Sequence, residues 1–448
     1  MDKNDNKKII IIGAGFSAGV LCLHLLSNKF TIPSNIIVLG NGDLGAGSAY
    51  NKLNNHYRLN IRDSLMKIWD DDPEHFIRWC KKNVRDNLAK TKQGNFYKRK
   101  DFYRYFHDCL ISIKDHEKIK KFDEKVINIK RSNSKISKWS LYCESGNLYS
   151  SDTIVIATGF SDPKWPFYTY GFNNQLIENP WIENLEEKIL VNDRVILVGG
   201  GLTAMDCIHF FESKNHNGKV FVITPCGSLP PVQTNWKNKV KIKWPKIKKS
   251  SDFIRFVRKK LNSTDWTKVT WQEKFESIRI GFNDTWQKLD DFQKKLLIKH
   301  FRHFWNNARF RSSPQTYNSA KRMLRKNKLI IIKGRAEAVK KLKEELFLET
   351  NTGNKIFFDK IVNCSGSGNS ELIENLIINK IVDQDVTKKN IRVNNELEII
   401  NKKGEVVSGL FALGSLNVGS LGDVVAANSI SNYARKLAIK LVSKNRRL

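Results

Sequence analysis

The sequence lacks closely spaced cysteines and long apolar runs. None of its seven cysteines forms a C-x-x-C motif, which excludes the spacings of zinc ribbons and thioredoxin-like redox sites. We expect reduced thiols in a cytoplasmic protein, because disulfides persist mainly in oxidising compartments. No stretch reaches the ~20 apolar residues of a transmembrane helix. The apolar run from Ile9 is interrupted at dinucleotide-binding spacing, so it predicts a strand, a turn and a helix, not an export signal.

Acidic residues are scarce relative to basic ones. The 448 residues include 77 Lys and Arg against 45 Asp and Glu, a formal net charge of +32. Such a charge attracts nucleic acids, acidic substrates or an anionic membrane face. Because Lys, Asn and Ile are abundant throughout, we favour a compositional bias of the genome over dedicated nucleic-acid binding. The chain is 40% hydrophobic and long enough for two or three domains.

A glycine-rich turn lies near the N-terminus. Residues 8–12 predict a buried parallel strand, and Gly13–Ala18 follows as G-x-G-x-x-A at the start of a helix. Gly13 permits the tight turn, Gly15 lets the backbone approach a pyrophosphate, and Ala18 allows close packing of helix on strand. The helix N-terminus offers N–H groups to phosphates. The motif therefore predicts a dinucleotide site, and a plain tight turn is the alternative.

The carboxylate expected after the second strand is absent. That strand is predicted at 35–39, and an Asp or Glu at its end would accept hydrogen bonds from ribose hydroxyls. Gly40 and Asn41 follow it instead, with Asp43 close behind. Asn41 is a candidate neutral acceptor, and Asp43 is a candidate substitute.

A second glycine-rich turn follows a predicted strand at 195–198. The residues predicted to contact NAD(P) are Gly199, Gly200, Gly201, Leu202 and Thr203. Two such units in one chain indicate hydride transfer from a nicotinamide to a flavin, and the alternative is that the second unit serves only as scaffold. The strand predicted at 219–224 ends without a carboxylate for a free 2′-hydroxyl, which favours NADPH.

Two further stretches suit a flavin site. Ala157, Thr158 and Gly159 follow a predicted strand, and small residues there let the chain cross close to a cofactor. A strand near the C-terminus ends at Gly414 and leads to a helix, whose N-terminus suits a phosphate or the flavin ring. An ordinary strand-to-helix turn is the alternative at the second position.

The segment at about 226–325 is rich in Lys, Trp and Phe, and is predicted to be mainly helical. We therefore expect an α/β fold with two Rossmann-like dinucleotide-binding units, for FAD and NAD(P), and an inserted, mainly helical, basic region. The expected domains are 1–165 for the first part of the FAD-binding domain, 166–335 for the NAD(P)-binding unit with its insertion, and 336–448 for the return to the FAD-binding domain.

Residues 237–249 carry seven lysines and no acid. Lys237, Lys239, Lys241 and Lys243 alternate with apolar residues, which predicts a strand with one cationic face. This face suits nucleic acid, lipid headgroups or an acidic substrate, and a solvated edge strand protected by lysines explains it equally well.

Titratable side chains farther along offer few candidates for catalysis. His300 and His303 share a helix face, but without a carboxylate or thiol at ligand spacing they predict no metal site. Arg309 and Arg311 are the candidate substrate-binding residues, because guanidinium groups grip phosphates and carboxylates. Asp423 and His300 are the candidate acid or base.

Several segments match one known family. They are Gly47-Ser48-Ala49-Tyr50, Leu59-Asn60-Ile61, Asp72-Pro73-Glu74-His75-Phe76, Arg99 before Tyr105, Trp305 to Arg311, and Asn363-Cys364-Ser365-Gly366. The chain resembles, nearly end to end, the bacterial FAD/NAD(P)-binding oxidoreductases of the YdhS type, which are related to flavin-containing monooxygenases. The resemblance implies NAD(P)H in the second unit and FAD in the first. It implies a flavin site of Gly13, Gly15, Phe16, Ser17, Asn60, Arg99, Thr158 and Gly414.

The sequence departs from this family near the C-terminus and in the insertion. The family's Gly-Pro-Leu-Thr-Arg-Gly is Gly414–Gly419 here, its Arg-His-Arg is Arg309-Phe310-Arg311, and its Trp-Glu is Gly422-Asp423. These departures lie where the substrate or the nicotinamide is expected.

The sequence thus predicts a FAD-dependent oxidoreductase that NAD(P)H reduces. A monooxygenase acting on a small molecule, with an acidic molecule as one option, is the leading hypothesis. The alternative is a flavin-binding or sensor protein without turnover that docks on a polyanion through its basic surface. The absence of a closely spaced cysteine pair disfavours a disulfide-reductase relay.

Overall fold

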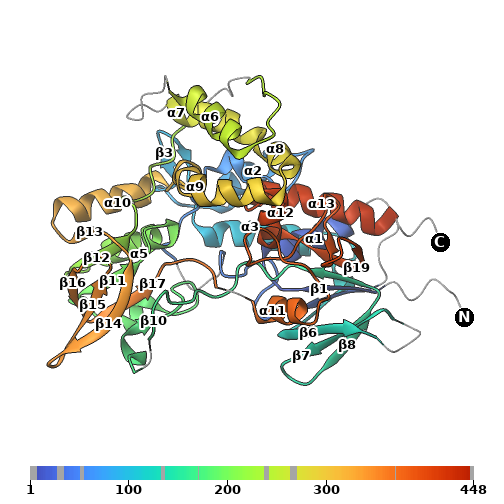
Figure 1. Cartoon of the computed structure of the whole chain (residues 1–448), viewed down its shortest axis with the longest axis horizontal. Helices are drawn as coiled ribbons and strands as arrows, with labels where there is room; N and C mark the ends of the chain where they lie inside the picture. The colour runs from blue at the N-terminus through green and yellow to red at the C-terminus, as the bar shows by residue number, and fades with distance from the viewer. Residues whose placement is uncertain are drawn as a thin grey trace, which may run out of the picture.

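The computed structural model describes residues 8–27, 35–50, 55–132, 137–169, 171–236, 242–262, 270–368 and 370–443. Two parallel sheets lie side by side, the first toward the right of Figure 1 and the second toward the left, with a group of helices at the top. We call the parts built around these sheets the first and second units. This arrangement confirms the predicted α/β fold with two Rossmann-like units and a helical insertion.

The first sheet has the order β18-β19-β9-β1-β2-β5. Its strands are β1 (Lys8–Ile12), β2 (Asn35–Leu39), β5 (Ile119–Phe122), β9 (Thr153–Ile156), β18 (Glu398–Ile400) and β19 (Val406–Ala412). β1 pairs in parallel with β2 and β9, so Ile12 lies beside Leu39 and Ile156. The central strands are continuously apolar because both faces of the sheet are covered.

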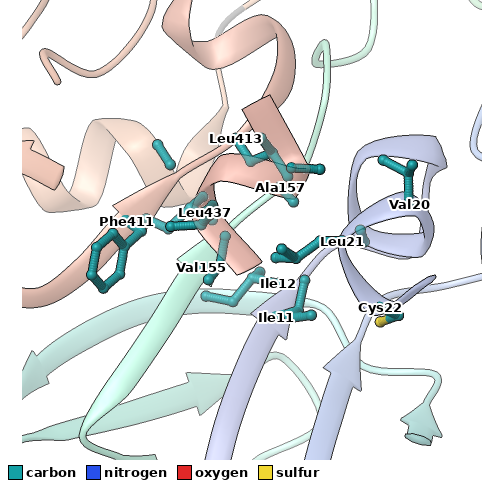
Figure 2. Close-up of a cluster of buried hydrophobic side chains, with 14 of the residues drawn as sticks. Ile11, Ile12, Val20, Leu21, Cys22, Val155, Ala157, Phe411, Leu413 and Leu437 are labelled. Carbon is teal, nitrogen blue, oxygen red and sulfur yellow. The ribbon is translucent and has the colours of Figure 1, made fainter. Parts of the chain in front are cut away.

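Two helices from opposite ends of the chain cover one face of this sheet. α1 (Phe16–Leu26) and α13 (Ala427–Ser443) pack against each other. Figure 2 shows Leu21 of α1 and Leu437 of α13 close to Ile12, Val155 and Leu413. The apolar runs at both ends of the sequence therefore form one core, which fixes the turn after β1 on a rigid support.

The second sheet repeats the topology of the first. Its order is β10-β17-β11-β12-β13, and β17-β11-β12-β13 corresponds to β9-β1-β2-β5. The elements are β10 (Leu176–Ile177), β11 (Val195–Val198), α5 (Leu202–Ser213), β12 (Val220–Thr224), α10 (Pro314–Arg325), β13 (Leu329–Lys333) and β17 (Lys360–Asn363). Helix α4 (Leu185–Lys188) precedes β11. Each unit thus presents one glycine-rich turn at the carboxyl end of a central strand.

Each unit also carries a small antiparallel sheet before the strand that its glycine turn crosses, β9 in the first unit and β17 in the second. In the first unit it is β6 (Val126–Arg131), β7 (Trp139–Cys143) and β8 (Leu148–Ser151). In the second unit it is β14 (Ala336–Leu342), β15 (Glu345–Thr350) and β16 (Lys355–Phe358). Because β16 leads into the buried central strand β17, the chain returns to the first sheet after β17, later than the boundary expected at residue 335.

The inserted helices lie between β12 and α10. They are α6 (Ser250–Leu261), α7 (Thr270–Ile280), α8 (Phe282–Lys288) and α9 (Asp291–Arg309), and they share a core that includes Phe253, Phe275 and Trp305. The strand predicted over 237–249 is wrong where it can be examined, because residues 242–249 form no regular element and 237–241 lie outside the described residues. Trp244 and Ile247 pack on the helical core instead of on a neighbouring strand.

The remaining elements connect or cover the sheets. They are α2 (His75–Asn83), β3 (Lys90–Thr91), β4 (Gly94–Asn95), α3 (Arg99–Ile111), α11 (Glu371–Ile378) and α12 (Val418–Leu421). The hairpin of β3 and β4 separates α2 from α3. Within the residues described, no helix has the length and apolar character needed to cross a membrane.

Candidate functional site

The first glycine turn crosses very close to the neighbouring strand. Gly13 has φ +107°, and a Cβ atom on it would lie 2.5 Å from the carbonyl oxygen of Ala157. Only a residue without a side chain fits there. Gly15 is the N-cap of α1 and no side chain caps that helix, while Ala18, in the first turn of the helix, is completely buried. The backbone N–H groups at the start of α1 are thus left for an external acceptor.

Buried polar atoms without partners border this turn. The Thr158 hydroxyl follows the crossing point, and the Ser415 hydroxyl follows Gly414, where a Cβ atom would collide with Ser17 Oγ. Asn417 Oδ1, on the short turn that begins at Gly414, also has no hydrogen-bond partner within the described structure, and neither does Asn60 Oδ1 in the segment between β2 and α2. Because buried polar groups are almost always hydrogen-bonded, this donor and acceptor set fits a polar ligand such as a dinucleotide.

Other residues expected at the flavin occupy different roles. The Phe16 ring packs against Tyr50, Phe102 and Phe106, which leaves only its backbone facing the turn. Asn41 is exposed after β2, and Gly159 is half-buried beside open space.

Arg99 joins the two units. Its Nη2 donates to Asp206 Oδ2 on α5 at 2.7 Å, its Nε donates to the Arg58 carbonyl oxygen, and its guanidinium group stacks on Trp181. Burial raises the pKa of Asp206 to about 6, although the charge of Arg99 acts to lower it. The resemblance implied a flavin contact for Arg99, but its guanidinium group forms an ion pair with Asp206 of the second unit. Sequence reasoning missed Asp206 as its partner, and a carboxylate within the apolar run Ala204–Ile208 is the signal that could have found it.

The second glycine turn repeats the geometry of the first. Gly199 has φ +110°, and a Cβ atom on it would meet the carbonyl oxygen of Cys364 even more closely than at Gly13. Gly201 is the uncapped N-cap of α5 and has no neighbouring atom within 4 Å of an added Cβ atom. Gly200 lies against the Thr224 side chain, and Leu202 and Thr203 are half-buried on the first turn of α5. The open helix N-terminus fits a second pyrophosphate.

The two arginines expected to bind substrate are engaged in a buried ionic network. Arg309 Nε donates to Asp423 Oδ2 at 2.7 Å, and Arg279 Nη1 donates to the same oxygen at 3.0 Å. Arg311 forms an ion pair with Glu276 at 3.0 Å. Burial would raise the pKa of Asp423, but the two guanidinium groups outweigh it and lower that pKa. The network joins the insertion to the segment before α13, and neither arginine presents an unpaired charge to an acidic substrate.

The two candidates for acid or base, Asp423 and His300, lie in very different surroundings. Asp423 is held as a buried carboxylate between guanidinium groups, a state that favours charge balance over proton transfer. His300 is exposed on α9, where it faces solvent and not the glycine turns. The geometry therefore supports neither residue in the predicted role.

Comparisons with known proteins agree with this fold. Residues 10–161 match a family described as FAD-NAD(P)-binding. No curated protein matches the sequence. The ornithine N-hydroxylase of Kutzneria sp. 744 is 11% identical, with a TM-score of 0.65 over 98% of this chain and 100% of that one. The L-lysine 6-monooxygenase of Pseudomonas syringae is 13% identical, with a TM-score of 0.64 over 97% of this chain and 99% of that one.

A solved structure from a different reaction class is also similar. The bacillithiol disulfide reductase of Staphylococcus aureus is 12% identical, with a TM-score of 0.56 over 98% of this chain and 99% of that one. At such identities the likeness shows the fold alone. The chain has the fold of flavin- and NAD(P)-dependent oxidoreductases, including monooxygenases. The resemblance to FAD/NAD(P)-binding oxidoreductases that the sequence predicted is confirmed at the level of the fold.

Proposed function

We propose that the protein is a FAD-dependent oxidoreductase that NADPH reduces, and that it hydroxylates a small molecule. The supporting observation is the matched pair of turns, in which Gly13 lies against Ala157 and Gly199 lies against Cys364. Each turn opens onto the N-terminus of an uncapped helix. Two such sites on duplicated units suit a pair of dinucleotides, one in each unit.

The residues of the chain would hold and orient the cofactors. When bound, FAD would accept a hydride from NADPH and pass the electrons to oxygen or another acceptor. The N-termini of α1 and α5 would bind the pyrophosphates, and the unpartnered hydroxyls of Thr158 and Ser415 would hydrogen-bond the flavin dinucleotide. The network around Asp423 would hold the insertion against the segment that leads to α13.

For the substrate we propose a small molecule that carries a primary amine. Arg309 and Arg311, the candidate residues for an acidic substrate, are paired with Asp423 and Glu276 and do not support that option. Among the similar structures are hydroxylases named for ornithine, lysine and cadaverine, which all carry a primary amine.

The test begins with the purified protein and its flavin. We expect a yellow protein whose flavin absorbance bleaches when NADPH is added without oxygen. With air, we expect ornithine, lysine or cadaverine to raise NADPH oxidation and to yield a hydroxylamine, whereas a dicarboxylic acid has no effect. A colourless protein that takes up no FAD would contradict the proposal. Reduction of the flavin without product from any amine would contradict its substrate.

A second function is favoured by one surface. Residues 242–262 contain eight Lys and Arg and a single acid, Asp252. All eight are exposed, namely Lys243, Lys246, Lys248, Lys249, Arg255, Arg258, Lys259 and Lys260. Arg255, Arg258 and Lys259 line a depression of about 530 Å³ on α6.

This basic surface suits a flavin-binding protein that docks on a nucleic acid without turnover. That function predicts a flavin that NADPH cannot reduce, together with retention on RNA that falls steeply as salt rises. Reduction of the flavin by NADPH would rule it out.

A further inference from the structure

The two units can be superposed position by position through their strand registers. In the first unit, Ile12 before the glycine turn pairs with Leu39, which pairs with Phe122. In the second unit, Val198 pairs with Ile223, which pairs with Ile332. One step farther along the third strand come Asp123 and Lys333. Equivalent positions thus carry an acid in one unit and a cation in the other.

Asp123 lies beside the place where a ribose carboxylate is expected but missing. Its Oδ1 accepts a hydrogen bond from the Gly42 backbone N–H at 3.1 Å, in the segment that follows β2. It also contacts Lys121, and its side chain is 71% exposed. In dinucleotide-binding folds the ribose hydroxyls lie at the end of the second strand. Asp123 therefore brings a carboxylate to that end from the neighbouring strand β5.

Lys333 occupies the corresponding place in the second unit. It ends β13 beside Thr224, the last residue of β12, and a Cβ atom on Gly227 would lie 3.1 Å from its Cβ atom. Its side chain is exposed, and it has no ion pair with any residue that the structure describes. A cation at this edge attracts the 2′-phosphate that distinguishes NADPH from NADH.

We propose that Asp123 and Lys333 select the ribose that each unit binds, unphosphorylated in the first unit and 2′-phosphorylated in the second. Asp123 accepts hydrogen bonds from ribose hydroxyls and repels a 2′-phosphate, whereas Lys333 attracts one. The assignment rests on the proposed function, because it names the specificity of the same two sites. It also explains how the first unit functions without the usual acid at the end of β2.

The test for Lys333 uses adenosine 2′,5′-bisphosphate and adenosine 5′-monophosphate as probes for calorimetry of the FAD-loaded protein. We expect the bisphosphate to bind about tenfold more tightly than the monophosphate, in line with one added charge contact. Lys333→Ala removes this preference. Lys219→Ala, an exposed lysine at the opposite end of the same sheet, keeps it.

Two results would overturn the role of Lys333: no preference in the unmodified protein, or an unchanged preference in Lys333→Ala. If the bisphosphate is preferred through Lys333 but NADPH fails to reduce the flavin, the proposed function fails and the assignment of Lys333 stands. The two ideas are therefore tested separately.

The test for Asp123 is the affinity for FAD, measured by the fluorescence of flavin released on dilution. Asp123→Asn is expected to weaken FAD binding about tenfold, because a neutral amide is a poorer acceptor for two hydroxyls than a carboxylate. Glu117→Gln changes an exposed acid before β5, at the far end of the sheet, and leaves the affinity unchanged. Equal affinities in Asp123→Asn and the unmodified protein would refute the role of Asp123.

Discussion

Gly13 passes so close to Ala157 that a Cβ atom at residue 13 would lie 2.5 Å from the carbonyl oxygen of residue 157. Gly199 stands in the same relation to Cys364. The first glycine of each turn is thus required by the fold itself. Two residues farther along, Gly15 and Gly201 are uncrowded, so their substitution separates ligand binding from folding.

Gly201→Ala should impair the use of NADPH and leave the rest of the protein intact. An added methyl group meets no atom of the chain within 4 Å, but it enters the space where the backbone approaches a pyrophosphate. We expect a folded, FAD-containing protein with an unchanged melting temperature. Its flavin is reduced by NADPH at least about tenfold more slowly, a loss of ~1.4 kcal/mol of binding. Rapid mixing without oxygen measures the rate.

Gly199→Ala is the matched comparison for that experiment. Its methyl group would collide with the backbone at Cys364, so we expect a lower melting temperature as well as loss of NADPH use. Equal rates of flavin reduction in Gly201→Ala and the unmodified protein would show that no pyrophosphate approaches α5.

Gly15→Ala is expected to yield a folded but colourless protein. The nearest atom to an added Cβ atom is Gly47 Cα at 3.6 Å, an ordinary contact, so the chain itself tolerates the methyl group. The same methyl group lies at the N-terminus of α1, where the flavin pyrophosphate is expected. Flavin absorbance and circular dichroism of the purified protein provide the two measurements. A variant that keeps its full complement of FAD would contradict this placement of the cofactor.

The glycine turns were predictable because their signal is local. A continuous apolar strand, two glycines at fixed spacing and a helix lie within about 20 residues, and both units follow this pattern. The strand β17 was not predicted in the second sheet because its pairing with β11 joins residues far apart in the chain. The alternation of lysines with apolar residues around Lys243 predicted a strand wrongly. A period of two indicates a strand only where a neighbouring strand can pair with it.

The roles of Arg309 and Arg311 could not be predicted from the sequence for a related reason. Local sequence indicates that a guanidinium group is present, but not which carboxylate it meets. Asp423 lies more than a hundred residues beyond Arg309, and Glu276 lies on another helix of the insertion. Arginines that are adjacent to aromatic residues in a basic segment therefore suggested a substrate site, whereas folding buries them against acids.

Asp423→Asn should destabilise the protein strongly. Asp423 is 5% exposed and balances the charges of Arg279 and Arg309. Its neutralisation leaves Arg309 without a carboxylate partner among the described residues, and leaves Arg279 with Glu276 alone, which Arg311 shares. We expect a loss of about 3–5 kcal/mol in the free energy of unfolding near neutral pH, measured by urea denaturation. The lowered pKa of Asp423 means that its stabilisation is present above its unfolded pKa and is lost as pH falls through the folded value.

Asp70→Asn is the control for Asp423. Asp70 pairs with Arg435 at 2.7 Å, but both side chains are about half exposed, so we expect a change of at most about 1 kcal/mol. Similar losses in the two variants would mean that the network around Asp423 contributes no more than a surface ion pair.

Asp206→Asn should change how stability depends on pH. Burial raises the pKa of Asp206 from 3.8 to about 6, so the folded state binds a proton more tightly than the unfolded state does. Ionisation of Asp206 therefore costs stability as pH rises from about 4 to 6, and an amide removes this cost while it can still accept from Arg99. Relative to the unmodified protein, Asp206→Asn should gain roughly 3 kcal/mol over that range and then stay level.

Glu212→Gln, on the same helix as Asp206, is the comparison for this pH dependence. Hydrogen bonds from Arg322 lower the pKa of Glu212, so its stabilisation is complete above its unfolded pKa. Its difference from the unmodified protein should therefore stay flat above about pH 5, where that of Asp206→Asn still rises. Urea denaturation at several pH values measures both. A flat difference for Asp206→Asn would show that Asp206 ionises as readily in the folded chain as in the unfolded one, and that its burial against Arg99 carries no cost.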